Sequence, residues 1–255
     1  MTRTSPLLLS APALALLGGF VLAPLVLLLR VSLCELPAGR GFYAPDTFTL
    51  QNYTRLFDPH HLSIIAFTVG FAIAVAGVSL TVGYPLALFI RGRADRWQSL
   101  AVGLVLIPKG AGTLAVLFGL QRLLPRGVVS AVLTEAYLIV PYAVLVLVVQ
   151  LRGIDPTLLA AARGLGANRW QTFRRVTLPL SWPGIILASE LGLAWGVGAF
   201  AGPSFLGGPD EMTLSVEVQR QAFEYGRWPQ AAADAVGLAV LALLVLAAVR
   251  FRRSP

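Results

Sequence analysis

Six long apolar segments constrain this chain more than any other feature of its sequence. A helix needs about 20 mostly apolar residues to cross the hydrocarbon core of a bilayer, and each of the six reaches that length. They are too long for the strands of a membrane barrel, which favours helices. The predicted spans cover residues 6–29, 62–90, 98–121, 127–151, 180–203 and 229–249.

The low charge content agrees with a membrane location. Charged residues make up 13% of the chain, whereas a soluble domain carries roughly 25%, so a soluble enzyme and a disordered chain are excluded. We predict an all-α membrane protein in which six transmembrane helices form a single domain over residues 1–255. The alternative for 6–29 is a cleaved signal peptide, but the segment is longer than a usual signal core and only Arg3 precedes it.

Basic residues are distributed unevenly between the two sides of the predicted membrane. With a cytoplasmic N-terminus, the inner segments hold 12 of the 20 Lys and Arg residues and the outer loops hold seven. Cytoplasmic loops are rich in Lys and Arg. Both termini are therefore predicted to face the cytoplasm, and the net charge of +8 needs no nucleic-acid partner to explain it.

Residues that ligate metals are few. Cys34 is the single cysteine, which excludes an internal disulfide and a cysteine-based zinc cluster. His60 and His61 are the only histidines, and neither cysteine nor carboxylate accompanies them at ligand spacing. We therefore predict no metal site and place both histidines at the end of an ordinary outer loop.

Three ionisable residues lie inside predicted spans, namely Lys109, Glu135 and Glu190. Such residues are costly in a bilayer and usually face the bundle interior or an aqueous path. The helical rise places all three near mid-membrane, about 15–17 Å from the inner edge, so Lys109 is able to pair with either glutamate. A structural ion pair, a substrate path, and snorkelling or uncharged burial all stay open, and the surplus carboxylate mildly favours a cationic cargo.

The fifth span carries four glycines near its predicted outer end, Gly192, Gly196, Gly198 and Gly202. The spacing of the first two permits close approach of a neighbouring helix. The glycines and the following Pro203 indicate a helix that bends or ends early. Close packing and a hinge are both open interpretations. In the next outer loop, helical spacing of apolar residues between 212 and 225 predicts a short surface helix.

The inner loop at residues 152–179 (the 152–179 loop) has an unusual pattern. Asp155 and Pro156 predict a helix start, followed by an apolar stripe that Gly164 and Gly166 interrupt. Asn168 is expected to cap a second short helix, which Leu178-Pro179 should end. From physics alone this helix-break-helix is either a docking surface or an amphipathic element on anionic lipid.

The 152–179 loop resembles the "EAA" loop in permease subunits of binding-protein-dependent ABC importers. The family pattern is E-A-A, three residues, G, nine residues, I, one residue, L-P. Here Ala160-Ala161-Ala162, Gly166, Val176 and Leu178-Pro179 stand at those spacings. Ala160 replaces the family glutamate, which puts a carboxylate anchor at this position in doubt. The motif residues and their neighbours expected to couple to an ATPase are Ala160, Ala161, Ala162, Arg163, Leu165, Gly166, Arg169, Val176, Leu178 and Pro179.

The resemblance extends over most of the chain. Residues 50–57 and 83–87 look like the same family, and 198–208 are most similar to the spermidine/putrescine-type branch. The resemblance implies a type I importer permease fold, in which the 152–179 loop is a cytoplasmic helical coupling loop. It also implies a second permease subunit, expected to be non-identical, two ATPase subunits and an external solute-binding protein in the cytoplasmic (inner) membrane.

The chain contains no phosphate-loop motif, so ATP and magnesium are expected in the partner ATPase and no cofactor in this chain. The predicted function is an importer permease subunit for a polyamine-like cation, without enzymatic activity of its own. Ferric iron, thiamine and aminophosphonate importers of the same branch are alternatives. A stand-alone secondary transporter or channel is another, although the sequence shows no convincing internal repeat.

Overall fold

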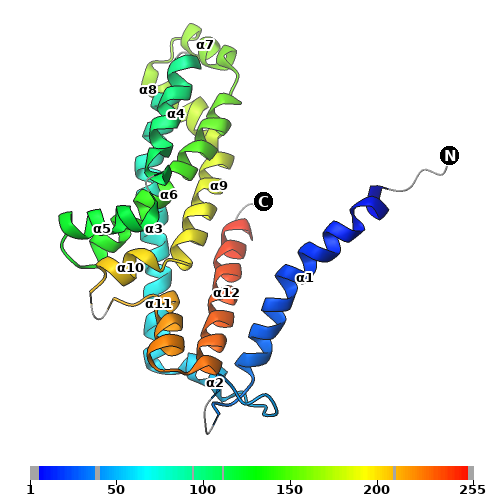
Figure 1. The fold of residues 1–255 in the computed structure, drawn as a ribbon. Helices are drawn as coiled ribbons and strands as arrows, with labels where there is room; N and C mark the ends of the chain where they lie inside the picture. Colours follow the sequence, from blue (N-terminus) through cyan, green and yellow to red (C-terminus); the bar gives the residue numbers. More distant parts are fainter. Residues whose placement is uncertain (1–5, 38–40, 94, 111, 209–210, 252–255) are drawn as a thin grey trace, which may run out of the picture. The chain divides into compact units, whose positions relative to one another are not determined.

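The computed structural model describes residues 6–37, 41–93, 95–110, 112–208 and 211–251. Within these ranges the chain is almost entirely helical, and its β pairing is one isolated bridge between Glu35 and Ala44. The longer elements (Figure 1) are α1 (Pro6–Ser32), α3 (Pro59–Arg91), α4 (Asp95–Gly110), α5 (Thr113–Leu123), α6 (Val128–Arg152), α9 (Leu178–Val197) and α12 (Trp228–Phe251). The shorter ones are α2 (Gln51–Thr54), η1 (Arg55–Phe57), α7 (Pro156–Gly164), α8 (Arg169–Thr172), η2 (Phe173–Thr177), α10 (Ala201–Leu206), α11 (Leu214–Gln219) and η3 (Arg220–Glu224).

The chain divides into two compact units, each made from segments that are distant in sequence. Unit 1 comprises Met1–Leu62 and Glu217–Val240, and unit 2 comprises Ser63–Val216 and Leu241–Pro255. The long helices α3 and α12 each contribute residues to both units. The single-domain organisation over 1–255 stays a prediction.

Four described helices have the length and apolar character needed to cross a membrane. They are α3, α6, the continuous helix Arg169–Val197 and α12, and they correspond to the second, fourth, fifth and sixth predicted spans. The first predicted span falls on α1, whose described apolar part is Gly18–Ser32. The total of six spans stays a prediction.

The third predicted span, 98–121, is wrong as one continuous helix. α4 ends at Gly110 and α5 begins at Thr113, and both are shorter than a spanning helix. Gly112, directly before α5, has φ = +75°, a left-handed conformation that glycine adopts readily and that an α-helix does not contain. Apolar residues continue on both sides of the break, so hydropathy alone did not reveal it.

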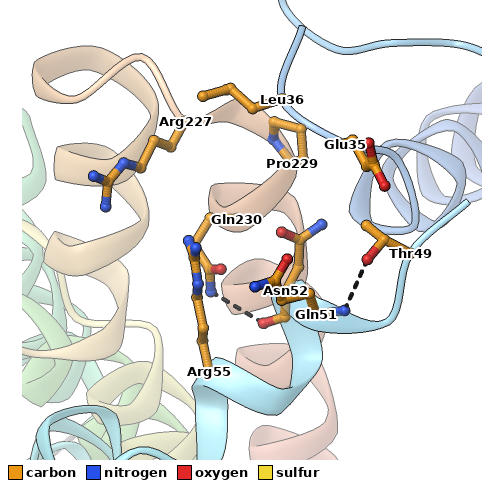
Figure 2. Close-up of a pocket in the computed structure, with 9 residues that line it drawn as sticks. All are labelled: Glu35, Leu36, Thr49, Gln51, Asn52, Arg55, Arg227, Pro229 and Gln230. Carbon is orange, nitrogen blue, oxygen red and sulfur yellow. Dashed lines mark hydrogen bonds between the residues drawn. The ribbon is translucent and has the colours of Figure 1, made fainter. Parts of the chain in front are cut away.

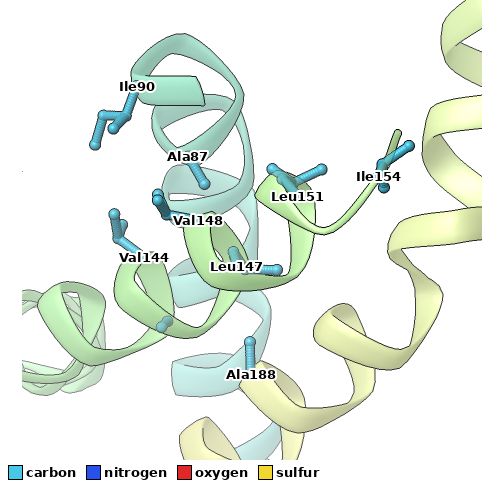
Figure 3. Packing of buried hydrophobic residues seen from close by; sticks show 9 residues of the cluster. Ala87, Ile90, Val144, Leu147, Val148, Leu151, Ile154 and Ala188 are labelled. Atoms are coloured by element: carbon cyan, nitrogen blue, oxygen red, sulfur yellow. The ribbon is translucent and has the colours of Figure 1, made fainter. Parts of the chain in front are cut away.

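The core of unit 2 forms where α3, α6 and α9 meet (Figure 3). On α6, Val144, Leu147, Val148 and Leu151 recur every three or four residues and therefore share one face. They pack with other buried apolar residues, which are Ala87, Ile90, Ala143, Ile154 and Ala188. Large apolar side chains also stay exposed, including Leu243 and Leu244 of α12, as expected where lipid replaces water.

The predicted surface helix at 212–225 forms α11 and the π-helical turn η3, but part of it is buried. Leu214 is fully buried, and its N–H donates to Thr68 Oγ1 at 2.9 Å. Glu217 is also buried. The spacing therefore identified the helix correctly, but the helix is not wholly at the surface.

Candidate functional site

The 152–179 loop begins with a capped helix, α7. Asp155 Oδ1 accepts the N–H of Thr157 at 2.8 Å, and Pro156 occupies the first turn, which confirms the predicted helix start. This hydrogen bond lowers the pKa of the Asp155 carboxyl below its usual range, because it stabilises the ionised form. No residue of α7 is buried, so local capping rather than burial specifies where the helix begins.

A glycine turn leads into the second helix of the loop. Gly166 has φ = +87°, so a side chain at this position would strain the backbone. Asn168 Oδ1 accepts the N–H of Gln171 at 2.8 Å, and the N–H of Asn168 donates to Gln171 Oε1 at 2.9 Å. This reciprocal capping box begins α8 and confirms the predicted helix-break-helix.

The prediction that Leu178-Pro179 ends the second helix is wrong. α8 continues through the π-helical turn η2 into α9, so that Arg169–Val197 is one continuous helix. The N–H of Leu178 donates to the carbonyl of Phe173, five residues earlier. The wider turn lets the helix pass Pro179, which lacks an N–H and would otherwise crowd the preceding turn.

The 152–179 loop presents apolar and basic side chains to its surroundings. Leu165 is 90% exposed and Trp170 is 66% exposed, and Arg163, Arg169, Arg174 and Arg175 are exposed as well. Among the other residues singled out from the sequence, Ala160, Ala161, Gly166 and Pro179 are exposed, and Ala162, Val176 and Leu178 are partly buried. Figure 1 shows α7 and α8 beyond one end of the α6–α9 pair. An exposed apolar anchor among arginines suits a partner with an apolar pocket and an acidic rim.

Glu135 lies at a junction inside unit 2 and is 1% exposed. Its Oε1 accepts the N–H of Gly202 at 2.7 Å, and its Oε2 accepts Trp195 Nε1–H at 2.7 Å. Both carboxylate oxygens thereby join α6 to residues of α9 and α10. The geometry fits a structural role, since a buried carboxylate is stabilised by such donors.

Glu190 of α9 is also buried, and its Oε1 lies 3.8 Å from the guanidinium Nε of Arg250 in α12. The exposed Arg250 thus supplies an ion partner that the sequence did not suggest. Lys109 belongs to the last turn of α4, but its side chain lies outside the described part of the structure. A pairing of Lys109 with either glutamate therefore stays a prediction.

Gly192 and Gly196 lie where α9 crosses α3. A Cβ at Gly192 would stand 2.9 Å from the Cα of Ala76, and one at Gly196 would stand 2.5 Å from the Cα of Ala72. Real Cβ atoms essentially never come so close to backbone. The two helices approach closely because neither glycine has a side chain, as in membrane helix pairs generally.

The other two glycines lie around the end of α9. Gly198 follows the last residue of the helix, and a Cβ there meets only ordinary contacts. At Gly202 a Cβ would stand 2.7 Å from the carbonyl oxygen of Ala131, so α10 also packs closely on α6. The predicted fifth span ends early, at Val197.

Unit 1 contains a polar cluster that the sequence did not reveal. His61, Glu217 and Asp234 are buried, and one ligand atom of each lies within 4.8 Å of the others. These residues come from α3, α11 and α12. Because they are far apart in sequence, no local spacing connects the two carboxylates with the histidine.

A polar pocket of about 350 Å³ lies in the same unit (Figure 2). Gln230 lines it, and its Nε2 donates to the backbone carbonyl of Asn52 at 3.2 Å. The Asn52 amide donates in turn to the carbonyls of Ser32 and Cys34, at 2.9 Å each. The hydrogen bonds thus tie the start of α12 to the end of α1.

Comparison with known proteins decides the family. Residues 79–253 match the family described as "Binding-protein-dependent transport system inner membrane component". The chain belongs to this family. It is 30% identical to the spermidine/putrescine transport system permease protein PotB of Haemophilus influenzae, over 89% of this chain and 86% of that protein. PotB of Escherichia coli is 27% identical, over 89% and 90% of the two chains.

The solved structures agree on the fold of this permease. A bacterial alginate ABC transporter, in complex with a pentasaccharide-bound periplasmic protein, matches with a TM-score of 0.71 and 19% identity, over 94% of this chain and 91% of that chain. The all-α fold of a type I importer permease is therefore confirmed. The chain is a membrane-embedded permease subunit of an ABC importer, and the 152–179 loop lies inside the matched region.

Proposed function

We propose that this permease imports a small polyamine-like cation and takes its energy through the 152–179 loop from an ATPase. One observation carries the coupling role: Leu165, on the turn between two capped helices, is 90% exposed. The two ATPase subunits bind ATP and magnesium, close on the loop and rock this chain against a second, non-identical permease. A binding protein delivers the cargo on the side opposite the loop.

The membrane orientation follows from the same assignment. The loop must face the cytoplasm to meet an ATPase. If the chain crosses the membrane six times, as the sequence predicts, both termini then face the cytoplasm too, in agreement with the excess of basic residues on that side. The identity to PotB permeases supports the polyamine class of cargo. Glu190, Glu135 and Lys109 are the candidate residues of the cargo path.

A matched pair of variants tests the coupling role. Leu165→Asp places a charge on the exposed loop and should reduce co-purification of the ATPase by at least 10-fold. Phe57→Asp changes another exposed apolar residue (75% exposed, in η1) and should leave the ATPase bound. Equal ATPase recovery from both variants would refute docking at the 152–179 loop.

Uptake assays test the cargo. Labelled putrescine or spermidine should accumulate in vesicles only with ATP and the binding protein, and ferric iron, thiamine or an aminophosphonate should not compete. Glu190→Gln and Glu135→Gln should weaken uptake at normal expression if these carboxylates shape the path. Uptake driven by an ion gradient without the ATPase would instead identify a secondary transporter.

A further inference from the structure

His61, Glu217 and Asp234 converge inside unit 1. His61 Nε2 lies 3.7 Å from Asp234 Oδ1, and one ligand atom of each of the three residues lies within 4.8 Å of the others. Asp234 is 0% exposed, and the other two are more than nine-tenths buried. Two carboxylates held this close in a buried site repel each other unless a proton or a positive charge neutralises one of them.

Within the part of the chain that the structure describes, four buried polar atoms in or beside the cluster have no hydrogen-bond partner. They are His61 Nε2, Asp234 Oδ2 and the amide oxygens of Gln221 and Gln230, whose amide nitrogens bond to the two carboxylates. The carboxylate and amide oxygens are acceptors, and the imidazole nitrogen is one in the tautomer protonated at Nδ1. Because buried acceptors are normally satisfied, these atoms suit an electron-pair acceptor such as a metal ion.

Two glutamines orient the carboxylates. Gln221 Nε2 donates to Glu217 Oε1 at 2.6 Å, and Gln230 Nε2 donates to Asp234 Oδ1 at 2.9 Å. Each pair is separated by one helical turn, and the second oxygen of Asp234 is left without a partner. Outer hydrogen bonds of this kind fix the ligands of protein metal sites.

We propose that His61, Glu217 and Asp234 bind one divalent transition-metal ion, for which Zn²⁺ and Mn²⁺ are suitable probes. One imidazole nitrogen and two carboxylate oxygens suit these metals, whereas Ca²⁺ and Mg²⁺ prefer oxygen ligands alone. With metal–ligand bonds of about 2.0–2.2 Å in tetrahedral geometry, two ligand atoms of one ion lie about 3.3–3.6 Å apart. The His61–Asp234 separation of 3.7 Å is close to this range, and small side-chain rotations would bring the three ligand atoms into it.

The bound ion is a resident of the fold and not the cargo, because all three ligands are buried. It joins α3, α11 and α12 through their residues in unit 1 and neutralises both carboxylates. The assignment departs from the sequence expectation of no metal site. It does not depend on the proposed cargo, since a complex that transports no polyamine is still able to hold the ion.

The test uses the assembled transporter, purified in detergent with an affinity tag that lacks histidine. The unmodified complex and a complex carrying Glu217→Gln and Asp234→Asn are each incubated with stoichiometric Zn²⁺ and dialysed. Elemental analysis should find one more zinc ion per copy of this chain in the unmodified complex than in the double variant. His61→Gln should weaken apparent zinc affinity at least 10-fold. The matched control His60→Gln changes the adjacent exposed histidine and should retain the ion.

Two further measurements cover variants that fail to fold. The first is zinc X-ray absorption of the unmodified complex, from which the spectrum of the Glu217→Gln, Asp234→Asn double variant is subtracted. The difference should show nitrogen and oxygen ligands around the ion and no sulfur. Gln230→Leu keeps all three ligands and should weaken zinc binding about 10–100-fold. The proposal is overturned if the unmodified complex retains no more Zn²⁺ or Mn²⁺ than the double variant. It is also overturned if spermidine, and not a metal, raises the melting temperature in an Asp234-dependent way.

Discussion

The close crossing of α3 and α9 makes a quantitative prediction for Gly196→Ala. The new Cβ would lie 2.5 Å from the Cα of Ala72, about 1 Å inside ordinary contact distance. Because the struck atom belongs to the backbone, no rotamer change relieves the overlap, and the helices must separate. Overpacking of this kind costs about 1–3 kcal/mol.

A control glycine isolates this steric cost. A Cβ at Gly77, also within a long apolar helix, meets nothing within 4 Å. Both substitutions gain about the same helix propensity, roughly 1 kcal/mol, so the difference between the two variants isolates the overlap. We expect Gly196→Ala to be less stable than Gly77→Ala by about 1–3 kcal/mol.

The assay is thermal unfolding of the purified complex in detergent. At roughly 2–4 °C per kcal/mol for a chain of this size, the Gly196→Ala complex should melt several degrees below the Gly77→Ala complex. Adding Ala72→Gly should recover only part of the loss, because the nearest atom is Cα. Equal melting temperatures would refute the close approach of the two helices.

Three further predictions concern local hydrogen bonds. Glu135→Gln replaces an accepting oxygen with a donor that faces Trp195 Nε1–H or the Gly202 N–H, so stability should fall by about 1–3 kcal/mol; an unchanged melting temperature contradicts the junction. The pKa of Asp155 is lowered, so its hydrogen bond to the Thr157 N–H should be fully present above the usual aspartate pKa of about 3.9. The bond should be lost as the pH falls through the lower pKa of the folded state, and amide exchange at Thr157 should then accelerate. Asp155→Asn should not show this pH-dependent acceleration if the carboxylate is the cap. Asn168→Ala removes the α8 cap and should cost about 0.5–2 kcal/mol of local helix stability, seen as faster exchange of the capped amides, whereas Asn168→Asp should preserve their protection.

Features of the 152–179 loop were predictable where the determinants are local. The Asp155–Thr157 and Asn168–Gln171 hydrogen bonds each join residues at most three positions apart, so the sequence pattern contains both partners. The continuation of the helix past Pro179 was not predictable by the same rules. A proline normally ends a helix, and only the π-helical turn before it allows the chain to continue.

Long-range contacts account for the other differences. Hydropathy located the apolar segments but not the break between α4 and α5, since apolar residues lie on both sides of it. Glu190 pairs with Arg250, which is 60 residues away and was assigned to a cytoplasmic end. The buried cluster of His61, Glu217 and Asp234 joins residues up to 173 positions apart, so no motif in the sequence contains all three.

The unbroken helix from Arg169 to Val197 has a mechanical consequence. Its exposed end carries Trp170, and its buried end carries Gly196, whose backbone touches α3. Because the chain stays helical between these two residues, a displacement of the Trp170 end can be transmitted along one helix to the crossing with α3. The π-helical turn η2 and Pro183 are the two places where this helix is able to bend.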